Sequence, residues 1–159
     1  MTNIAQYAFT AQNKVTVLSD GSKLTSSDFD NKCKFKIFRF DQIKFLRKRI
    51  KSSFAHNFLK ENKIDLIFFD SWKSIELLNF NTHAKKICLV HGNEILNQRK
   101  KDRILNSLNK ADLIIFNSNY TKNKTIKNFK IIKKIDHKII HPAFVEKIFK
   151  SKIIKNKYD

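Results

Sequence analysis

The chain has 159 residues, of which 42% are hydrophobic, and carries 33 Lys and Arg against 14 Asp and Glu, a formal charge of +19 at pH 7. This length suits a single domain that buries roughly 70% of the surface its unfolded chain exposes. The apolar runs are far shorter than the ~20 residues of a membrane-spanning helix, and the first residues do not resemble a signal peptide, so we expect a cytoplasmic protein. The two cysteines, Cys33 and Cys88, lack metal-binding spacing and are expected to be buried thiols.

The positive charge favours anionic partners such as nucleic acid, anionic lipid or phosphorylated substrates. It does not choose among them, because Lys, Asn, Ile and Phe are abundant together, as an AT-rich genome would also produce. The aromatic residues lie inside apolar runs instead of standing exposed between basic residues, and no RNP1 pattern of an RNA-binding domain is present. These features argue against a nucleic-acid interface.

The first half of the chain predicts two strands and a long helix. Residues 14–20 are rich in β-branched side chains, and residues 33–40 alternate polar and apolar side chains, so both predict strands. The polar segment at 21–28 predicts a loop. From Asp41, apolar residues recur every three or four positions and would line one face of a helix that runs to about Glu61 and packs on a sheet. These residues are Ile43, Leu46, Ile50, Phe54 and Phe58.

The second half contains continuous apolar runs that suit strands covered on both faces. They lie at 64–70, 85–90 and 111–117. The remaining segments predict a short helix at 74–80, a helix at about 95–109, a helix capped by Ser or Asn near residue 118, and a last strand at 137–142. Strands that alternate with helices in this way are typical of an α/β, Rossmann-like parallel sheet with helices on both faces.

Polar residues follow successive strands at the edge where such sheets bind ligands, beyond the carboxyl ends of the strands. They are Asp70, His91, Gly92, Glu94, Asn117 and Ser118. We expect one crevice at this edge, where Gly92 lets the chain turn sharply and a ligand approach closely. Structural roles remain open for three of them: His91 as a histidine bonded to a backbone carbonyl, Glu94 as a charge at a helix start, and Ser118 as a helix cap.

Three motifs in order, "VHGNE", "ADLIIFNSNYTKN" and "HKIIHPAF", resemble the N-terminal half of a family-4 glycosyltransferase of the GT-B fold, over Lys14–Phe144. The resemblance implies retaining, metal-independent transfer of a sugar from a nucleotide-sugar. It also implies that this domain binds a sugar or lipid-linked acceptor and that a C-terminal domain binds the donor. His91 matches the family histidine at the interdomain cleft and is the candidate catalytic residue, and Ser118 matches the family serine that follows the strand of the second motif. No metal and no resident cofactor is implied for this chain.

The chain departs from the family pattern at both ends. Its first twenty residues match only the first helix and the second strand, and the usual "GVD" after the last strand is "HPAF". We therefore interpret residues 1–145 as a family-4 N-terminal domain without its first strand, and residues 146–159 as a basic tail or the start of an interdomain linker. Activity would need a donor domain or a partner chain. The missing strand would leave "KVTVLSD" or "KICLV" with an unpaired edge.

Family members that act on lipid-linked acceptors dock on membranes through a basic region of this domain. The resemblance therefore implies that Lys44, Arg47, Lys48 and Lys51, expected beside the apolar line of the long helix, bind the inner face of an anionic membrane. The alternative for this helix is a solvated surface. The alternative for the whole protein is a non-enzymatic module that holds an anionic ligand or nucleic acid in the crevice or on the basic surface.

Overall fold

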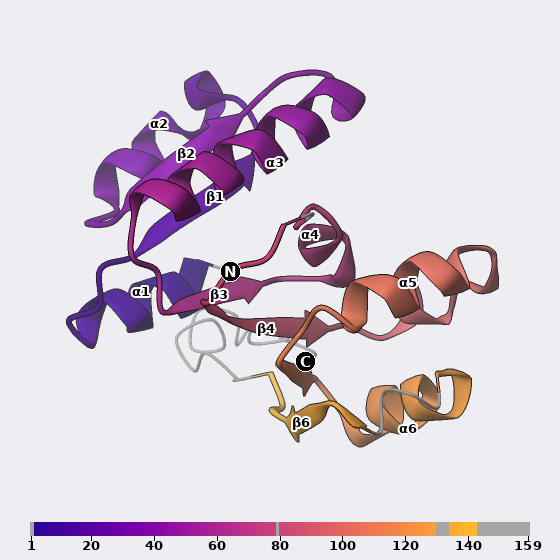
Figure 1. Cartoon of the computed structure of the whole chain (residues 1–159). Coiled ribbons are helices and arrows are strands. Elements are labelled where there is room, and N and C mark those ends of the chain that lie inside the picture. Colours follow the sequence, from indigo (N-terminus) through magenta and orange to yellow (C-terminus); the bar gives the residue numbers. More distant parts are fainter. Residues whose placement is uncertain (1, 79, 130–133, 143–159) are drawn as a thin grey trace, which may run out of the picture.

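The computed structural model describes residues 2–78, 80–129 and 134–142, and the predicted tail at 146–159 lies outside them. Helices and strands alternate along the chain (Figure 1). The helices are α1 (Thr2–Thr10), α2 (Lys23–Lys32), α3 (Lys44–Glu61), α4 (Trp72–Glu76), α5 (Lys101–Leu108) and α6 (Asn119–Asn128). The strands are β1 (Thr16–Asp20), β2 (Lys36–Phe40), β3 (Leu66–Phe69), β4 (Lys85–Val90), β5 (Leu113–Phe116) and β6 (Asp136–Ile139). Short 3-10 segments, η1 (Asn93–Leu96) and η2 (Gln98–Lys100), precede α5.

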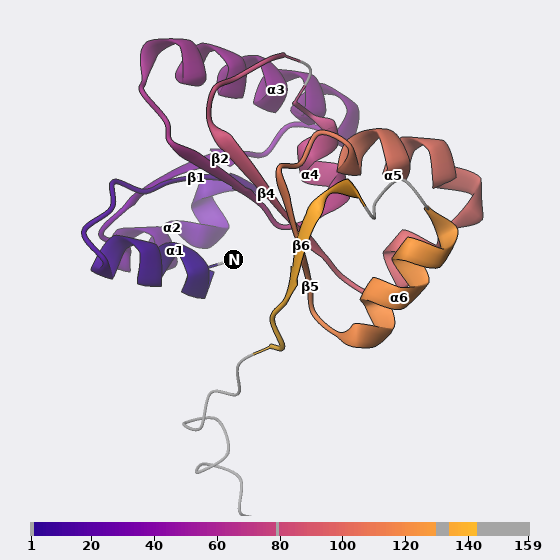
Figure 2. The ribbon, with the colours of Figure 1, turned by 60° about the horizontal axis from the view of Figure 1, so that its bottom comes forward.

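All strand pairs are parallel, which confirms the predicted α/β class, but the strands form two sheets. One sheet has the order β1-β2 and the other has the order β3-β4-β5-β6. Figure 2 shows α3 on one side of the β1–β2 pair and α1 and α2 on the other, whereas α4, α5 and α6 gather beside the longer sheet. Of the two strands predicted to have a free edge, "KVTVLSD" contains β1 and has one. "KICLV" does not, because β3 and β5 pair with β4 on its two sides; among the described strands the other free edges belong to β2, β3 and β6.

The prediction of a loop at 21–28 is wrong, because α2 occupies most of this segment. Strands β1 and β2 run in the same direction, so the chain must return across the sheet before β2 begins. A helix makes this return with its backbone hydrogen bonds satisfied, despite the polar sequence. The predicted start of the helix at about 95–109 is also wrong, because α5 begins only at Lys101. Before it, Asn97 has an extended backbone (φ −72°, ψ 100°), and its Oδ1 accepts a hydrogen bond from the N–H of Arg99 at 3.1 Å.

The predicted packing of α3 holds only for its second half. There the ring of Phe54 packs against Phe38 and Phe40 of β2 in tilted and edge-to-face geometry, with ring centroids 4.7 and 5.5 Å apart. In the first half, Ile43 is 75% exposed, and Leu46 and Ile50 are also exposed. Arg47 and Lys51 of the same helix instead contact Asp20, at the end of β1.

The main buried cluster belongs to the second half of the molecule. Each of its members lies between Phe69 and Phe129, and α3 contains no buried residue. Cys88 is in this cluster and fully buried, as predicted, whereas Cys33 is only half-buried. The carboxyl ends of β3, β4 and β5 are therefore held by a packed core. No helix within the described residues is both long and apolar enough to cross a bilayer.

Candidate active site

A cavity of 480 Å³ opens beyond the carboxyl ends of β3 and β4. Its lining residues are Asp70, Ser71, Leu89, His91 and Glu94. Asp70 and Ser71 directly follow β3, and His91 directly follows β4, its parallel neighbour, so the register of the sheet brings the two loops together. Three of the residues predicted for this edge, Asp70, His91 and Glu94, thus share one cavity.

The two carboxylates of the cavity are held in different ways. Asp70 Oδ1 accepts a hydrogen bond from Ser74 Oγ, one turn into α4. Glu94 Oε2 accepts from Lys73 Nζ at 3.0 Å, an ion pair between η1 and α4. The sequence analysis missed Lys73, because nothing in the local pattern separates it from the other surface lysines. Carboxylates in such positions can accept hydrogen bonds from the hydroxyl groups of a ligand.

The carboxylates also act on the thiol beneath the cavity. Burial, together with the negative charges of Asp70 and Glu94, raises the pKa of Cys88 to about 12. Cys88 is therefore a protonated, inert core residue and not a nucleophile. The two carboxylates of the cavity thus lie close enough to Cys88 for their negative charges to add to the effect of burial.

His91 is exposed at the end of β4. No backbone carbonyl of the described residues forms a hydrogen bond with its ring, in contrast to His137, whose Nδ1 lies 3.1 Å from the Ile135 carbonyl oxygen. The structural role left open for His91 is thus not seen. Its imidazole lines the cavity and is free to contact a ligand there.

A model of the family described as Glycosyltransferase Family 4 matches residues 1–143, which include both loops of the cavity. The chain belongs to Glycosyltransferase Family 4. It is therefore a glycosyltransferase-like domain, and the resemblance in its three motifs is confirmed. No curated protein and no solved structure matches the chain.

The remaining predicted residues of this family-4 domain, Gly92, Asn117 and Ser118, follow the ends of β4 and β5 but do not line the cavity. Gly92 has φ −22° and ψ −103°, and a Cβ added to it would meet no atom within 4 Å, so the space next to the loop is open. Asn117, after β5, has a buried Oδ1 without a hydrogen-bond partner among the described residues. Ser118 caps α6, accepting from the N–H of Thr121 at 3.1 Å, so the capping role left open for it is confirmed.

The cations predicted to face a membrane are mostly engaged by carboxylates of the family-4 domain. Arg47 and Lys51 lie 3.4 and 3.0 Å from the carboxylate oxygens of Asp20, at the end of β1, and Lys48 lies 2.9 Å from Glu76 Oε2. Positions 47 and 51 continue the inward stripe formed by the phenylalanines of α3, because helical neighbours recur every three or four residues. Arg47 and Lys51 are therefore half-buried against Asp20, whereas Lys48 remains exposed, and the binding of these cations to a membrane stays a prediction.

The outer surface at the start of α3 is apolar with a few cations. Phe45 is 64% exposed and lies beside exposed Ile43 and Leu46. The guanidinium of Arg49 stands 4.5 Å from the centre of the Phe45 ring, a cation–π contact, and Lys44 is exposed. Phe45 and Arg49 also line a second, open cavity of 600 Å³ between α3 and the segment after α4.

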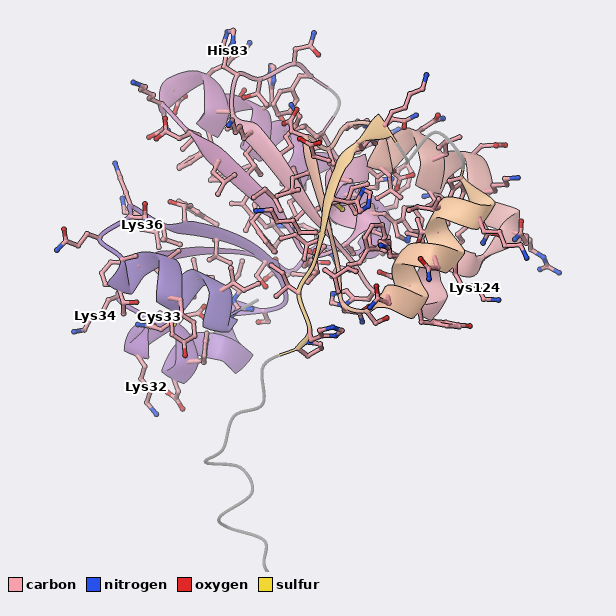
Figure 3. The ribbon with its side chains drawn as sticks, turned by 90° about the horizontal axis from the view of Figure 1, so that it is seen from below. Lys32, Cys33, Lys34, Lys36, His83 and Lys124 are labelled. Atoms are coloured by element: carbon pink, nitrogen blue, oxygen red, sulfur yellow. The ribbon has the colours of Figure 1, made fainter. Side chains whose placement is uncertain are left out.

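The other lysines of the family-4 domain are spread over separate parts of its surface. Figure 3 shows Lys32, Lys34 and Lys36 around the turn between α2 and β2, whereas Lys124 projects from α6 on the other side of the molecule. A basic stripe that follows a nucleic-acid backbone would instead gather these charges on one face.

Proposed function

We propose that this family-4 domain binds the acceptor in a retaining, metal-independent transfer of a sugar from a nucleotide-sugar. The observation that carries the proposal is the 480 Å³ cavity, which places Asp70, His91 and Glu94 together at the carboxyl edge of a parallel sheet in a family-4 chain. Ligands of open α/β sheets bind at this edge. A donor domain or a partner chain supplies the site for the nucleotide-sugar.

Each lining group has a role suited to its chemistry. The carboxylates of Asp70 and Glu94 accept hydrogen bonds from acceptor hydroxyls and so orient the sugar. His91 contacts the reacting hydroxyl and holds or moves its proton. Asn117, after β5, has a buried Oδ1 with no hydrogen-bond partner among the described residues, and its contact with a sugar stays a prediction. Since the carboxylates are already oriented by Ser74 and Lys73, little ordering is required when a sugar binds.

Acceptor binding is tested by nuclear magnetic resonance with a panel of methyl glycosides added to the isotope-labelled chain. We expect the backbone amide shifts to centre on the loops after β3 and β4. His91→Ala should weaken binding by about tenfold, and in an assembly with a donor domain it should lower turnover by roughly 10²–10⁴-fold. His83→Ala is the matched control, because His83 is an exposed histidine before the start of β4 (Figure 3).

The result that would overturn the proposal is a set of shifts centred away from these loops, or equal losses in the His91 and His83 variants. A His91 variant that unfolds would be recognised by its collapsed amide spectrum. Asp70→Asn then provides a second test of the same cavity, since it keeps the side-chain volume and removes the charge.

A lipid-linked acceptor is favoured by the exposed start of α3. Apolar side chains at Ile43, Phe45 and Leu46 can enter the boundary between headgroups and acyl chains, while Lys44 and Arg49 meet anionic headgroups. This surface lies beside the cations predicted from the sequence and includes one of them, Lys44. Docking at the inner face of a membrane would bring such an acceptor to the carboxyl edge, where α3 begins.

A further inference from the structure

Asp70 differs from the other half-buried carboxylates, because no cation of the described residues pairs with it. Four carboxylates within the described residues are half-buried. Three of them form ion pairs at 2.7 to 3.0 Å: Asp30 with Arg39, Glu76 with Lys48 and Arg103, and Glu94 with Lys73. Asp70, at the end of β3, is the fourth, and it forms no ion pair within this part of the chain.

Burial of a charge without a partner costs free energy, so proteins normally pair such a group. Cations are abundant in this chain, since 33 Lys and Arg stand against 14 Asp and Glu. The carboxylate of Asp70 has a single hydrogen bond instead, in which Ser74 Oγ donates to its Oδ1. Its Oδ2 accepts no hydrogen bond from the described residues. One oxygen of a half-buried carboxylate thus remains available for a donor that the described part of the chain does not supply.

Asp70 is one of the residues that line the 480 Å³ cavity, together with Ser71, His91 and Glu94. The carboxylate of Glu94 is neutralised by its ion pair with a lysine of α4, so Asp70 is the carboxylate of the cavity whose charge is not compensated. Ser71 precedes α4, but its side chain forms no capping hydrogen bond, so its hydroxyl is also available. The cavity therefore suits a ligand that carries a positive charge and several hydroxyl groups.

The cation that fits this arrangement is an organic ammonium group. An ammonium nitrogen carries three N–H donors, which Asp70 Oδ2 and the hydroxyl of Ser71 can accept. The hydrogen bond between an ammonium and a carboxylate is charge-assisted and about twice as strong as a neutral one. A metal ion would need several ligands, and the described residues hold no cluster of three His, Cys, Asp or Glu side chains suited to one.

We infer that the acceptor of this domain is a sugar with a free amino group, and that Asp70 binds the ammonium form of that amine. The inference rests on the proposed acceptor-binding function and names the class of acceptor. Glu94, held by Lys73, accepts hydrogen bonds from the hydroxyls of the same sugar. An N-acetyl group in place of the amine removes the positive charge and leaves one N–H donor, so the acetylated sugar loses the ion pair.

The test compares three series of methyl glycosides, titrated into the isotope-labelled whole chain at about pH 6.5, where a sugar amine is protonated. The first series carries only hydroxyl groups. The second has an amino group in place of one hydroxyl, at each position of the ring in turn, and the third has the same amines acetylated. At least one amino glycoside should bind at least about tenfold more tightly than its hydroxyl and N-acetyl counterparts, with amide shifts centred on the loops after β3 and β4.

Asp70→Asn tests the residue itself, because it keeps the side-chain volume and an oxygen for Ser74 while it removes the charge. The affinity for the amino glycoside should fall by about tenfold, whereas the affinity for its hydroxyl counterpart should change by less than about threefold. Asp65→Asn is the matched control, because Asp65 is an exposed carboxylate just before β3, at the opposite end of the strand, and its loss should change neither affinity. The formal charge of +19 repels cations in general, so a preference for the amine reports a local carboxylate.

Two results would overturn the inference. One is that no amino glycoside binds more tightly than its hydroxyl and N-acetyl counterparts, and the other is an equal preference for the amine in the wild type and in Asp70→Asn. If hydroxyl glycosides still shift the amides after β3 and β4, the acceptor-binding function stands and only the amine is wrong. Shifts centred elsewhere, or no shifts, would contradict both. If Asp70→Asn does not fold, the comparison of amino and N-acetyl glycosides on the wild-type chain decides alone.

Discussion

Neutralising Glu76 should destabilise the protein in a way that depends on pH. Glu76, the last residue of α4, joins three helices through its carboxylate. Arg103 of α5 donates to both of its oxygens at 2.8 and 2.9 Å, and Lys48 of α3 donates at 2.9 Å. Its side chain is only 18% exposed. The hydrogen bond from Arg103, followed by that from Lys48, lowers the pKa of Glu76 from 4.5 to about 2, against an opposing effect of burial.

The size of the effect follows from the linkage between proton binding and folding. A carboxyl group whose pKa falls from 4.5 to about 2 contributes at most about 3 kcal/mol to the free energy of unfolding at neutral pH. The side chains of Lys48 and Arg103 are 49% and 56% exposed, so water and salt screen the pairs. We therefore expect Glu76→Gln to cost about 1–2 kcal/mol at neutral pH. Because the folded-state pKa is depressed, this contribution is complete above pH 4.5 and is lost as the pH falls toward 2.

Urea unfolding of the wild type and the Glu76→Gln variant at several pH values between about 7 and 3 measures this difference. The difference between the two proteins in free energy of unfolding should be constant down to about pH 5 and should then decrease. Glu61→Gln is the control, because Glu61 is exposed at the end of α3 and makes no ion pair within the described residues. Two outcomes would contradict this prediction. One is an equal loss in the free energy of unfolding for both variants at neutral pH, and the other is a loss for Glu76→Gln that does not change with pH.

Three further predictions concern the thiols, the membrane and the reaction. Iodoacetamide at about pH 8 should alkylate half-buried Cys33 and leave Cys88 unmodified, because burial raises the pKa of Cys88 to about 12; peptide mapping that finds Cys88 modified in the folded chain would contradict this. Phe45→Ser combined with Arg49→Gln should weaken co-sedimentation with anionic vesicles by about tenfold while Lys60→Gln has no effect, and equal binding to neutral vesicles would count against docking. The purified 159-residue chain, given nucleotide-sugars and sugar or lipid acceptors, should transfer no sugar, and measured turnover would refute the need for a separate donor site.

The candidate cavity was largely predictable because its residues are fixed by their distance from strand ends. Asp70 follows one apolar run and His91 follows the next, and parallel strands end at the same edge. The ion pair of Glu94 was not predictable, since Lys73 lies on a different element, 21 positions away. Likewise, the sequence placed Ser118 before a helix but did not decide whether its hydroxyl caps that helix or contacts a ligand.

By itself, the sequence determined the elements whose stabilising pattern is local. Continuous apolar runs specified β3, β4 and β5, and a serine before a polar helix specified the start of α6. The tertiary structure decided which side of each element is buried and which strand edge is left free. In α3 the apolar line and the line of Arg47 and Lys51 lie close together on the helix surface. The two cations face inward, where they pair with the carboxylate of Asp20 at the end of β1. Such a choice depends on groups far apart along the chain, which local periodicity does not contain.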